Sequence, residues 1–387
     1  MAAITGWAHT RFGKLEGETV ESLIGSVTHE ALAHAGLDAG DIGAVYLGTF
    51  NGGMSDQGFS AGLVSMVHDG LRHTPATRLE NACATGSAAI HAALDAIAAK
   101  RIKAALVIGV EKMTAIPTAA VGDVLLKASY VPEEAGIDGG FAGVFGHIAE
   151  HYFQAYGDQR DALAAIAAKN HANGALNPLA HIQKDVGFDF CNTVSDKNPV
   201  VAGPLRRTDC SLISDGAAAM VIVDDDLAWH AERAIGFRAR THTNDVMALS
   251  RRDKTKLDGA ARAWHMALAD ARLSLDDLSF VETHDCFTIA ELMEYEAMGL
   301  AAPGKGGDVA RDGTTAIDGR LPVNPSGGLK AKGHPVGATG VSMHVMAAKQ
   351  LMGEPAGAKV ANAKTAGIFN MGGTAVANYV SILERVR

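Results

Sequence analysis

The chain has 387 residues, of which 20% are charged and 48% hydrophobic, so it can bury a large core and should form two or three domains. Its net charge of −9 argues against nucleic acid or an anionic membrane as the main partner. We expect a cytoplasmic protein, because no apolar stretch is long enough to span a membrane and the first residues do not resemble a signal peptide.

The first predicted helix covers Thr19–Ala35, where apolar residues recur at helical spacing, and Gly36 ends it. A strand is predicted next, over Ile42–Leu47. The same helix, loop and strand return in the second half of the chain. EALAHAGLDAGDIGAVYLGT, which begins at Glu30, resembles MALADARLSLDDLSFVETHD, which begins at Met266. Internal similarity of this kind indicates a duplicated architecture.

The next predicted helix lies in Asn81–Lys100, NACATGSAAIHAALDAIAAK, and begins just after Cys83. No charged residue occurs between Cys83 and Asp95, so we expect a buried helix. A thiol at the N-terminus of a helix lies near the positive end of the helix dipole, which favours the nucleophilic thiolate. The alternative is a core cysteine that packs as a small hydrophobic residue.

This helix also has a counterpart in the second half. Ala84-Thr85-Gly86 opens the helix after Cys83, and Ala338-Thr339-Gly340 opens another Ala-rich helix that runs to about Met352. An apolar strand follows each helix, over Ala104–Val110 and over Thr365–Met371. Two similar halves in which strands and helices alternate predict an α/β protein with buried sheets.

A Gly-rich segment from about residue 114 to residue 207 fits neither half, and we interpret it as an insertion with one clear helix, Asp161–Asn173. The strand Gly216–Val223 then returns to the first sheet. The predicted domains are therefore 1–113 plus 208–228, an inserted loop domain at 114–207, and a second half at 229–387. Such an insertion either shapes a ligand entrance or serves dimerisation or stability.

Two further segments carry groups suited to chemistry. Thr283–Thr288, THDCFT, directly follows the strand predicted over Leu278–Glu282, and strand ends are where ligands bind in α/β folds. Asn324–Gly340, NPSGGLKAKGHPVGATG, is a Gly-rich loop that carries His334 just before a helix. A single histidine is often structural, and the loop lacks the spacing of a phosphate-binding P-loop.

A third segment is Phe369–Thr374, FNMGGT, in which a glycine pair ends a strand. The free N–H groups of such a pair could serve an oxyanion hole.

Together these motifs resemble the thiolase family. ENACATGSAA, VIGVEKM, KNHANGALNPLA, HDCF and NPSGGLKAKGHPVGATG occur in the family's order over essentially the whole chain. HDCF replaces the NEAF-type motif of ordinary thiolases, and Asn370-Met371-Gly372 replaces their C-x-G motif. Both differences resemble thiolases of the sterol-carrier-protein-X type. The resemblance implies two βαβαβαββ halves in a five-layered α-β-α-β-α body, with a loop domain inserted in the first half.

The resemblance also implies roles for individual residues. Cys83 resembles the nucleophile that takes the acyl group from coenzyme A, and His334 resembles the base that removes its proton. His284 and His334 would hold the thioester oxygen of the second substrate. Cys286 is the candidate for the second acid/base, which ordinary thiolases supply from the C-x-G cysteine. The backbone N–H groups of Cys83 and Gly372 would form the other oxyanion hole.

The same resemblance implies no metal and no permanently bound cofactor, with coenzyme A and acyl-CoA acting as substrates. The remaining cysteines, Cys191 and Cys210, lie in no motif, and we interpret them as structural. The cysteines have no C-x-x-C spacing, which argues against a zinc site or a disulfide framework and for a reducing compartment. The residues that contact coenzyme A stay unassigned.

The implied function is Claisen condensation or thiolysis of 3-ketoacyl-CoA through an acyl-enzyme on Cys83. The alternatives are a decarboxylating ketoacyl synthase, a retro-aldolase or C-acyltransferase that acts with a small partner subunit, and a non-enzymatic scaffold or lipid-binding protein. A ketoacyl synthase would leave Cys286 idle, and a scaffold would not need Cys83 or His334. The resemblance also implies a homodimer or homotetramer.

Overall fold

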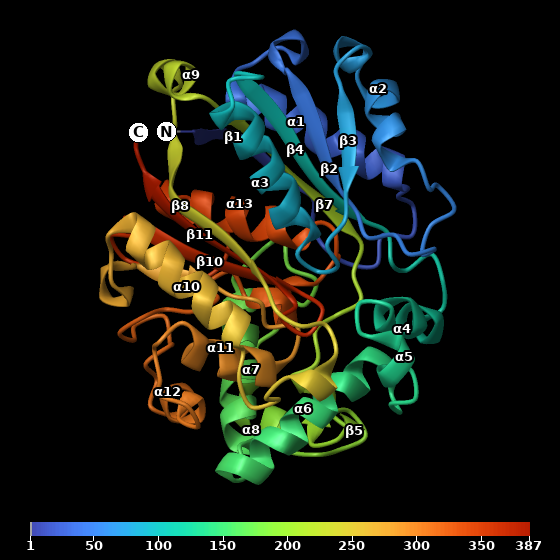
Figure 1. Cartoon of the computed structure of the whole chain (residues 1–387), viewed down its shortest axis with the longest axis vertical. Helices are drawn as coiled ribbons and strands as arrows, with labels where there is room; N and C mark the ends of the chain where they lie inside the picture. Colours follow the sequence, from blue (N-terminus) through green and yellow to red (C-terminus); the bar gives the residue numbers. More distant parts are fainter. Residues whose placement is uncertain (1) are drawn as a thin grey trace.

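The structure is a computed structural model that describes residues 2–387. Nine of its strands form one sheet whose two parts correspond to the two halves of the chain (Figure 1). The first part has the order β3 (Ala76–Leu79), β2 (Ala44–Gly48), β4 (Ala104–Glu111), β7 (Gly216–Val223) and β1 (Ala3–His9). The second part has the order β8 (Ile235–Asn244), β11 (Ala377–Arg385), β10 (Thr365–Gly372) and β9 (Phe280–Glu282).

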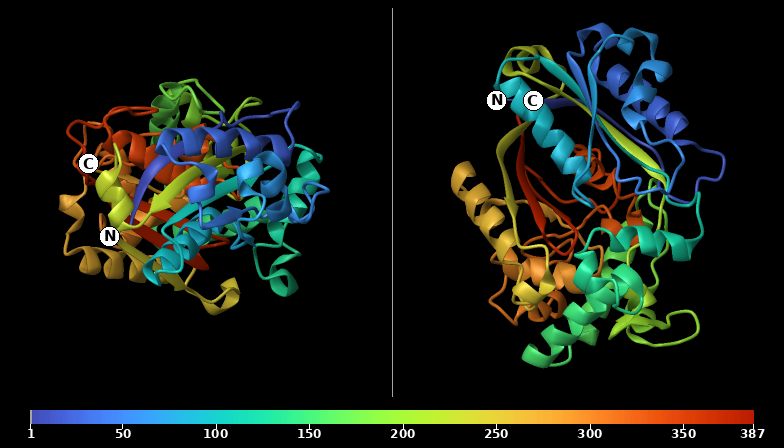
Figure 2. Two further views of the ribbon diagram at one scale, coloured as in Figure 1. Left: turned by 90° about the horizontal axis from the view of Figure 1, so that it is seen from above. Right: turned by 45° about the vertical axis from the view of Figure 1, so that its right-hand side comes forward.

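Helices cover both parts of the sheet and form the layers that the resemblance predicted (Figures 1 and 2). Helix α1 (Val20–Ala35) packs on one face of the first part, and α3 (Thr85–Ala98) and α13 (Thr339–Leu351) lie between the two parts. Helix α10 (Asp258–Ala271) covers the outer face of the second part. The two parts meet where Ile4 of β1 pairs with Ile235 of β8, so they also share a short stretch of hydrogen bonding.

The predicted internal repeat is confirmed. Helix α1 begins at the Thr19 capping box and ends at Gly36, whose φ of 64° is left-handed, and β2 follows. In the second half α10 ends at Arg272, whose φ of 55° is also left-handed, and β9 follows. Burial on both faces explains the continuous apolar sequence of β4, whose residues are all buried.

The remaining helices fill the edges of the body and the segment between the halves. Those of the two halves are α2 (Val64–Val67), α9 (Asp225–His230), α11 (Thr288–Ala297) and α12 (Gly306–Arg311). The segment 114–207 contains α4 (Thr118–Leu126), α5 (Val131–Glu134), α6 (Gly140–Tyr156), α7 (Arg160–Ala175), α8 (Gly187–Asn192) and the hairpin β5 (Val200–Ala202) and β6 (Leu205–Arg206). No helix among the described residues is both long and apolar enough to cross a membrane.

The inserted segment contains more helix than its sequence predicted. Helix α6 was missed because glycines interrupt its apolar pattern, and glycine disfavours helix interiors. One of these glycines is required by packing, because a Cβ on Gly146 would lie 2.9 Å from the backbone carbon of Ala202. The domain boundaries at 113/114 and 207/208 stay predictions.

The two helices between the sheets, α3 and α13, cross at the glycines of their matching Ala-Thr-Gly sequences. A Cβ on Gly86 would lie 2.6 Å from the backbone nitrogen of Val341, and a Cβ on Gly340 would overlap the backbone nitrogen of Ser87. The two helix N-termini can approach this closely only because neither residue has a side chain.

We therefore expect Gly86→Ala to destabilise the protein by roughly 1–3 kcal/mol, because the added methyl group forces α3 and α13 apart. Urea unfolding followed by circular dichroism measures this change. Gly122→Ala is the matched control, because Gly122 lies in α4 with open space around it and alanine favours the helix. Equal stability of the two variants would contradict the tight crossing.

Candidate active site

Cys83 lies in a tight turn between β3 and α3. Ala82 has a φ of 48°, and the Thr85 hydroxyl donates to the Ala82 carbonyl at 2.6 Å while it accepts from the Asn81 N–H at 2.8 Å. This turn ends the extended segment and begins α3 at Thr85, so that Cys83 lies just before the helix. The Cys83 side chain is only 4% exposed.

Burial changes the chemistry that the sequence predicted for this thiol. Desolvation raises the pKa of Cys83 to about 12, although a hydrogen bond from the Gly373 N–H opposes this shift. Burial therefore opposes the thiolate that the start of the helix was expected to favour, because a buried charge loses its hydration. The thiol needs a base to become a nucleophile.

His334 lies on the Gly-rich loop that precedes α13. Its Nδ1 is 2.7 Å from the Thr339 hydroxyl, and that hydroxyl donates its hydrogen to the Pro335 carbonyl at 2.9 Å. The Thr339 oxygen must therefore accept from Nδ1–H, which leaves Nε2 as the nitrogen able to take a proton. Burial, followed by the charge of Lys332, lowers the pKa of His334 to about 3.

Glu111, at the end of β4, holds this loop in place. Its carboxylate accepts from the Gly337 N–H at 2.9 Å and from the N–H groups of Phe50 and Asn51. Glu111 therefore ties the His334 loop of the second half to the first half.

Three of the predicted residues converge. The Cys83 sulfur and one ring nitrogen each of His284 and His334 all lie within 4.8 Å of one another. The two imidazole rings are nearly perpendicular, with centroids 5.1 Å apart. Such a group offers a nucleophile, a base and a hydrogen-bond donor, and its donor atoms would also suit a soft cation such as zinc.

His284 follows β9 and contacts a residue that the sequence analysis did not assign to the site. Asn370, in the middle of β10, has its amide nitrogen 2.9 Å from His284 Nδ1 and donates to the Cys83 carbonyl at 3.1 Å. The sequence does offer a signal for Asn370, because it is a polar residue in an otherwise apolar strand. It also stands where ordinary thiolases have the first residue of C-x-G. His284 Nε2 is buried and has no hydrogen-bond partner among the described residues.

Cys286 is buried close to this group but outside it. Its side chain is 3% exposed, and desolvation raises the pKa of its thiol well above the usual value, with a further contribution from Cys83. The backbone N–H of Ser211 donates to the Cys286 carbonyl at 2.9 Å, so the strand-end loop rests against the segment that directly follows the insertion.

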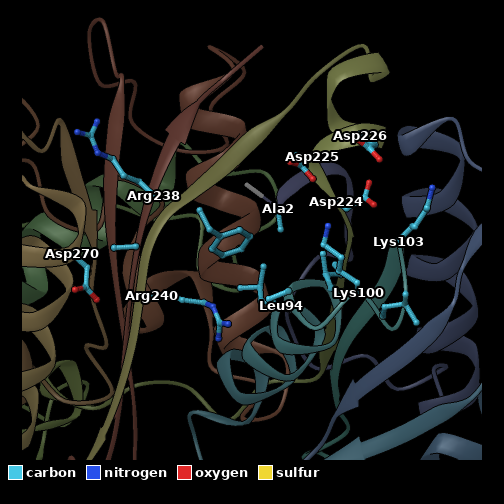
Figure 3. Close-up of a pocket in the computed structure, with 15 residues that line it drawn as sticks. Ala2, Leu94, Lys100, Lys103, Asp224, Asp225, Asp226, Arg238, Arg240 and Asp270 are labelled. Atoms are coloured by element: carbon cyan, nitrogen blue, oxygen red, sulfur yellow. The ribbon is translucent and has the colours of Figure 1, made fainter.

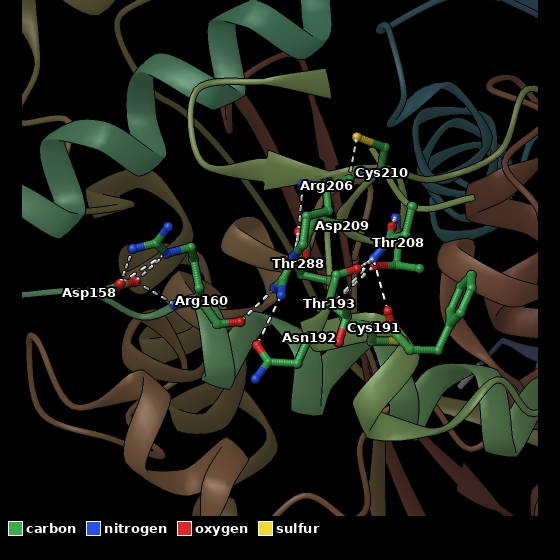
Figure 4. Close-up of polar contacts among 12 residues, drawn as sticks. Asp158, Arg160, Cys191, Asn192, Thr193, Arg206, Thr208, Asp209, Cys210 and Thr288 are labelled. Atoms are coloured by element: carbon green, nitrogen blue, oxygen red, sulfur yellow. Dashed lines mark hydrogen bonds and ion pairs between the residues drawn. The ribbon is translucent and has the colours of Figure 1, made fainter. Parts of the chain in front are cut away.

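The inserted segment anchors this loop through a buried ion pair (Figure 4). Arg206 donates to Asp209 at 2.9 Å, to the Asn192 side chain at 3.0 Å and to the Arg160 carbonyl at 2.6 Å. The Thr288 hydroxyl, two residues after Cys286, donates to the other oxygen of Asp209 at 2.9 Å. Asp209 therefore connects the insertion to the start of α11.

Asp285 connects the same loop to the Gly-rich loop. Its carboxylate accepts from the N–H groups of Leu329 and Lys330 and from the Asn170 side chain. Burial, followed by the nearby Glu291, raises the pKa of Asp285 to about 7. The hydrogen bonds of Asp285 fix the position of the His284 loop relative to the His334 loop.

The glycine pair after β10 lies against the Cys83 turn. Gly372 approaches the Asn81 carbonyl so closely that a Cβ would be 2.5 Å from it, and the N–H that bonds the Cys83 sulfur belongs to Gly373. The Gly373 N–H is therefore at the thiol, and the assignment of Gly372 to an oxyanion hole stays a prediction.

Cys83 also belongs to an apolar cluster. Its buried neighbours form one cluster with the thiol: Met54, Met113, Val121, Val124 and Val336. The thiol therefore has apolar side chains among its buried neighbours as well as the two imidazoles.

A cavity of about 660 Å³ lies elsewhere, at the C-terminal end of α3 (Figure 3). Its lining mixes both signs of charge, with Lys100, Lys103 and Arg240 near Asp224 and Asp270. Cys83 is at the opposite end of α3, a helix of 14 residues that spans about 20 Å. The cavity is therefore separate from the candidate active site.

The raised pKa predicts how alkylation of Cys83 by iodoacetamide depends on pH. We expect the rate to keep rising from about pH 6 to above about pH 9, because the thiolate fraction grows tenfold per pH unit below the pKa. Mass spectrometry of the tryptic peptides measures the rate for each thiol. A plateau near neutral pH would instead reveal a preformed thiolate–imidazolium pair with His334.

Comparisons with known proteins match the whole chain. The family described as "Thiolase, N-terminal domain" matches residues 2–226, and "Thiolase C-terminal domain-like" matches residues 241–385. The acetyl-CoA acetyltransferase of Methanothermobacter thermautotrophicus is 35% identical over 387 residues, covering 99% of both chains. Sterol carrier protein 2 of Bos taurus is 28% identical over 388 residues, covering 95% of this chain and 69% of that protein. A solved structure named "Ltp2-ChsH2(DUF35) aldolase" shares the fold, with a TM-score of 0.83 at 20% identity over 100% of this chain and 98% of that one.

Proposed function

The chain belongs to the thiolase family, and we propose that it is a CoA-dependent acyltransferase that cleaves or forms 3-ketoacyl-CoA through an acyl-enzyme on Cys83. The observation that carries this proposal is the convergence of Cys83, His284 and His334 within 4.8 Å. A scaffold or lipid-binding protein would have no need to keep these groups together in a buried site.

In the direction of thiolysis, His334 Nε2 removes the proton from the Cys83 thiol, and the sulfur attacks the 3-keto carbonyl. Backbone N–H groups beside the sulfur hold the oxyanion, for which Cys83 and Gly372 or Gly373 are the candidates. When the tetrahedral intermediate collapses, the bond between the α-carbon and the carbonyl carbon breaks. The acyl group stays on Cys83, and the leaving fragment is the enolate of a shorter acyl-CoA.

We assign the enolate oxygen to His284 and His334, and its α-carbon receives a proton from the Cys286 thiol. The raised pKa of Cys286 keeps this thiol protonated, so that a proton is available for the α-carbon. The proton that His334 took from Cys83 then passes to the Cys286 sulfur, which becomes a thiol again. In the second half-reaction His334 takes a proton from the thiol of coenzyme A, whose sulfur attacks the acyl-enzyme and displaces Cys83. His334 then gives this proton to the Cys83 sulfur, which restores the thiol and the neutral imidazole. Condensation is the reverse.

The test is a thiolysis assay with 3-ketoacyl-CoA esters of graded chain length. Coenzyme A-dependent loss of the ester, with an acyl adduct on Cys83 in mass spectrometry, would support the proposal. If no ester reacts although the protein is folded, the proposal fails.

A second candidate function is retro-aldol cleavage, or C-acyl transfer, that requires a small partner subunit. The similarity of fold to a structure named as an aldolase complex favours it. The presence of both Cys83 and His334 favours the acyltransferase, because a retro-aldol reaction needs no acyl-enzyme. The thiolysis assay, and an assay of the cleavage of 3-hydroxyacyl-CoA esters, each run with and without candidate partner proteins, separate the two functions, since only the second would require the partner.

We further propose a homodimer or homotetramer in the cytoplasm, acting in lipid metabolism. Strand β3 is at the end of the sheet, and an unpaired edge of this kind can join a second chain. The four free cysteines suit a reducing compartment. Sedimentation that finds only monomer at micromolar concentration would refute the oligomer.

A further inference from the structure

A chain of buried side chains connects α3, β10 and the end of β9 beneath the active site. The Ser87 hydroxyl is 2.7 Å from the Asn370 side-chain oxygen, and the Asn370 side-chain nitrogen is 2.9 Å from His284 Nδ1. Ser87, Asn370 and His284 are each 0% exposed. Water therefore does not compete for these hydrogen bonds, and their directions follow from the donors and acceptors present.

The Cys83 carbonyl sets the orientation of the Asn370 amide. This carbonyl lies 3.1 Å from Asn370 Nδ2 and can only accept a hydrogen bond. A flipped amide would bring two carbonyl-type oxygens together, so the NH₂ group must face Cys83 and His284. The Asn370 oxygen then accepts from the Ser87 hydroxyl, and every atom of the amide has a partner.

This orientation sets the hydrogen on the His284 ring. The NH₂ group of Asn370 donates to His284 Nδ1, so Nδ1 must carry a lone pair and Nε2 must carry the hydrogen of the neutral imidazole. Nε2 is the buried nitrogen that lacks a partner among the described residues. A second proton on Nδ1 would point at the amide hydrogens, so the charged form is disfavoured.

We propose that Asn370, braced by Ser87, is a positioning residue that holds His284 as a neutral donor with Nε2–H directed at the substrate oxygen. The two histidines then have opposite tautomers, with the hydrogen on Nδ1 in His334 and on Nε2 in His284. His334 can therefore accept a proton at Nε2, whereas His284 only donates a hydrogen bond. His284 therefore takes no part in proton transfer to the α-carbon, which receives its proton from Cys286, while His334 reprotonates Cys286. This inference rests on the proposed carbon–carbon chemistry for its effect on rate.

The first test is Asn370→Asp, which keeps the shape but replaces the amide donor with an acceptor. The carboxylate draws a proton to His284 Nδ1, so the neutral ring loses the hydrogen on Nε2. We expect the carbon–carbon step to fall by about tenfold to a hundredfold. Acylation of Cys83 by an acyl-CoA should change by only a few-fold. Activity of the variant should rise as the pH falls, because the imidazolium form regains Nε2–H.

Asn378→Asp is the matched control. Asn378 lies opposite Met371 on the neighbouring strand β11, is 0% exposed, and donates only to backbone carbonyls such as that of Ala375. The Asn378→Asp variant should show no recovery of activity at low pH. The proposal would be overturned if Asn370→Asp lost acylation and the carbon–carbon step equally and did not recover at low pH. Asn370 would then have only a structural role.

The second test is nitrogen NMR of the wild-type protein labelled at histidine, which reports the His284 tautomer without any assay of activity. A lone pair on Nδ1 and hydrogen on Nε2 support the proposal, and the opposite pattern overturns it. Ser87→Ala offers a milder change if Asn370→Asp does not fold, and it should weaken the carbon–carbon step several-fold. Absence of thiolysis by the wild type would refute the proposed function while leaving the tautomer measurement valid.

Discussion

Cys83→Ala is expected to abolish both thiolysis and condensation, because both directions pass through the acyl-enzyme on this thiol. Loss of a catalytic nucleophile can lower kcat by about a million-fold, so the variant should show no rate above background. Stopped assays in both directions measure this, and mass spectrometry checks that no acyl adduct forms. The substitution removes one small side chain from a buried turn, so the fold should persist.

Cys191→Ala is the control for this result. Cys191 is also fully buried, but it lies on α8 in the inserted segment and contacts the alanines of α7. The Cys191→Ala variant should still form the acyl adduct on Cys83 and should react at a rate within a few-fold of the wild type. Residual turnover by Cys83→Ala at more than a small fraction of the wild-type rate would show that the reaction does not proceed through this thiol.

Cys286→Ala should separate the two chemical steps. An acyl-CoA should still acylate Cys83, because that step uses His334, whereas cleavage and formation of the carbon–carbon bond should slow by about a hundred- to ten-thousand-fold. The cause is the loss of the group that exchanges a proton with the α-carbon. Single-turnover acylation followed by mass spectrometry, set beside steady-state thiolysis, measures the two steps independently.

Cys286→Ser gives a second measure of the same role. The hydroxyl is a far weaker acid than the thiol, so this variant should lose the carbon–carbon step as well while filling the same space. Wild-type rates for both variants would mean that Cys286 merely packs beneath the loop and that His334 alone moves the proton.

The resemblance to thiolases, together with the repeat, was enough to predict the layers and the residues that meet at the site. The repeat of α1 and β2 in α10 and β9 is visible because each unit depends on local apolar spacing and a local helix end. The convergence of Cys83, His284 and His334 was implied by motifs rather than by spacing. The pairing of β1 with β8 has no such signal, because it joins residues far apart in the chain.

Other features depend on contacts that the sequence does not show. Asn370 was passed over because its role requires Ser87, which is 283 residues away, and His284, which is 86 residues away. The effect of burial on the pKa of Cys83 was also missed, since helix position can be predicted from sequence but the loss of water around the sulfur depends on packing from both halves.

The crossing of α3 and α13 at Gly86 and Gly340 has a consequence for the origin of the chain. Equivalent residues of two similar halves face each other there, which is the geometry of a dimer whose subunits meet through the same patch. A half-length ancestor that paired with itself would have formed two identical clefts. In this chain the two halves differ at that point: Cys83 stands before one Ala-Thr-Gly sequence, whereas Gly337 stands before the other. The first half therefore carries the thiol, and the second half carries His284 and His334.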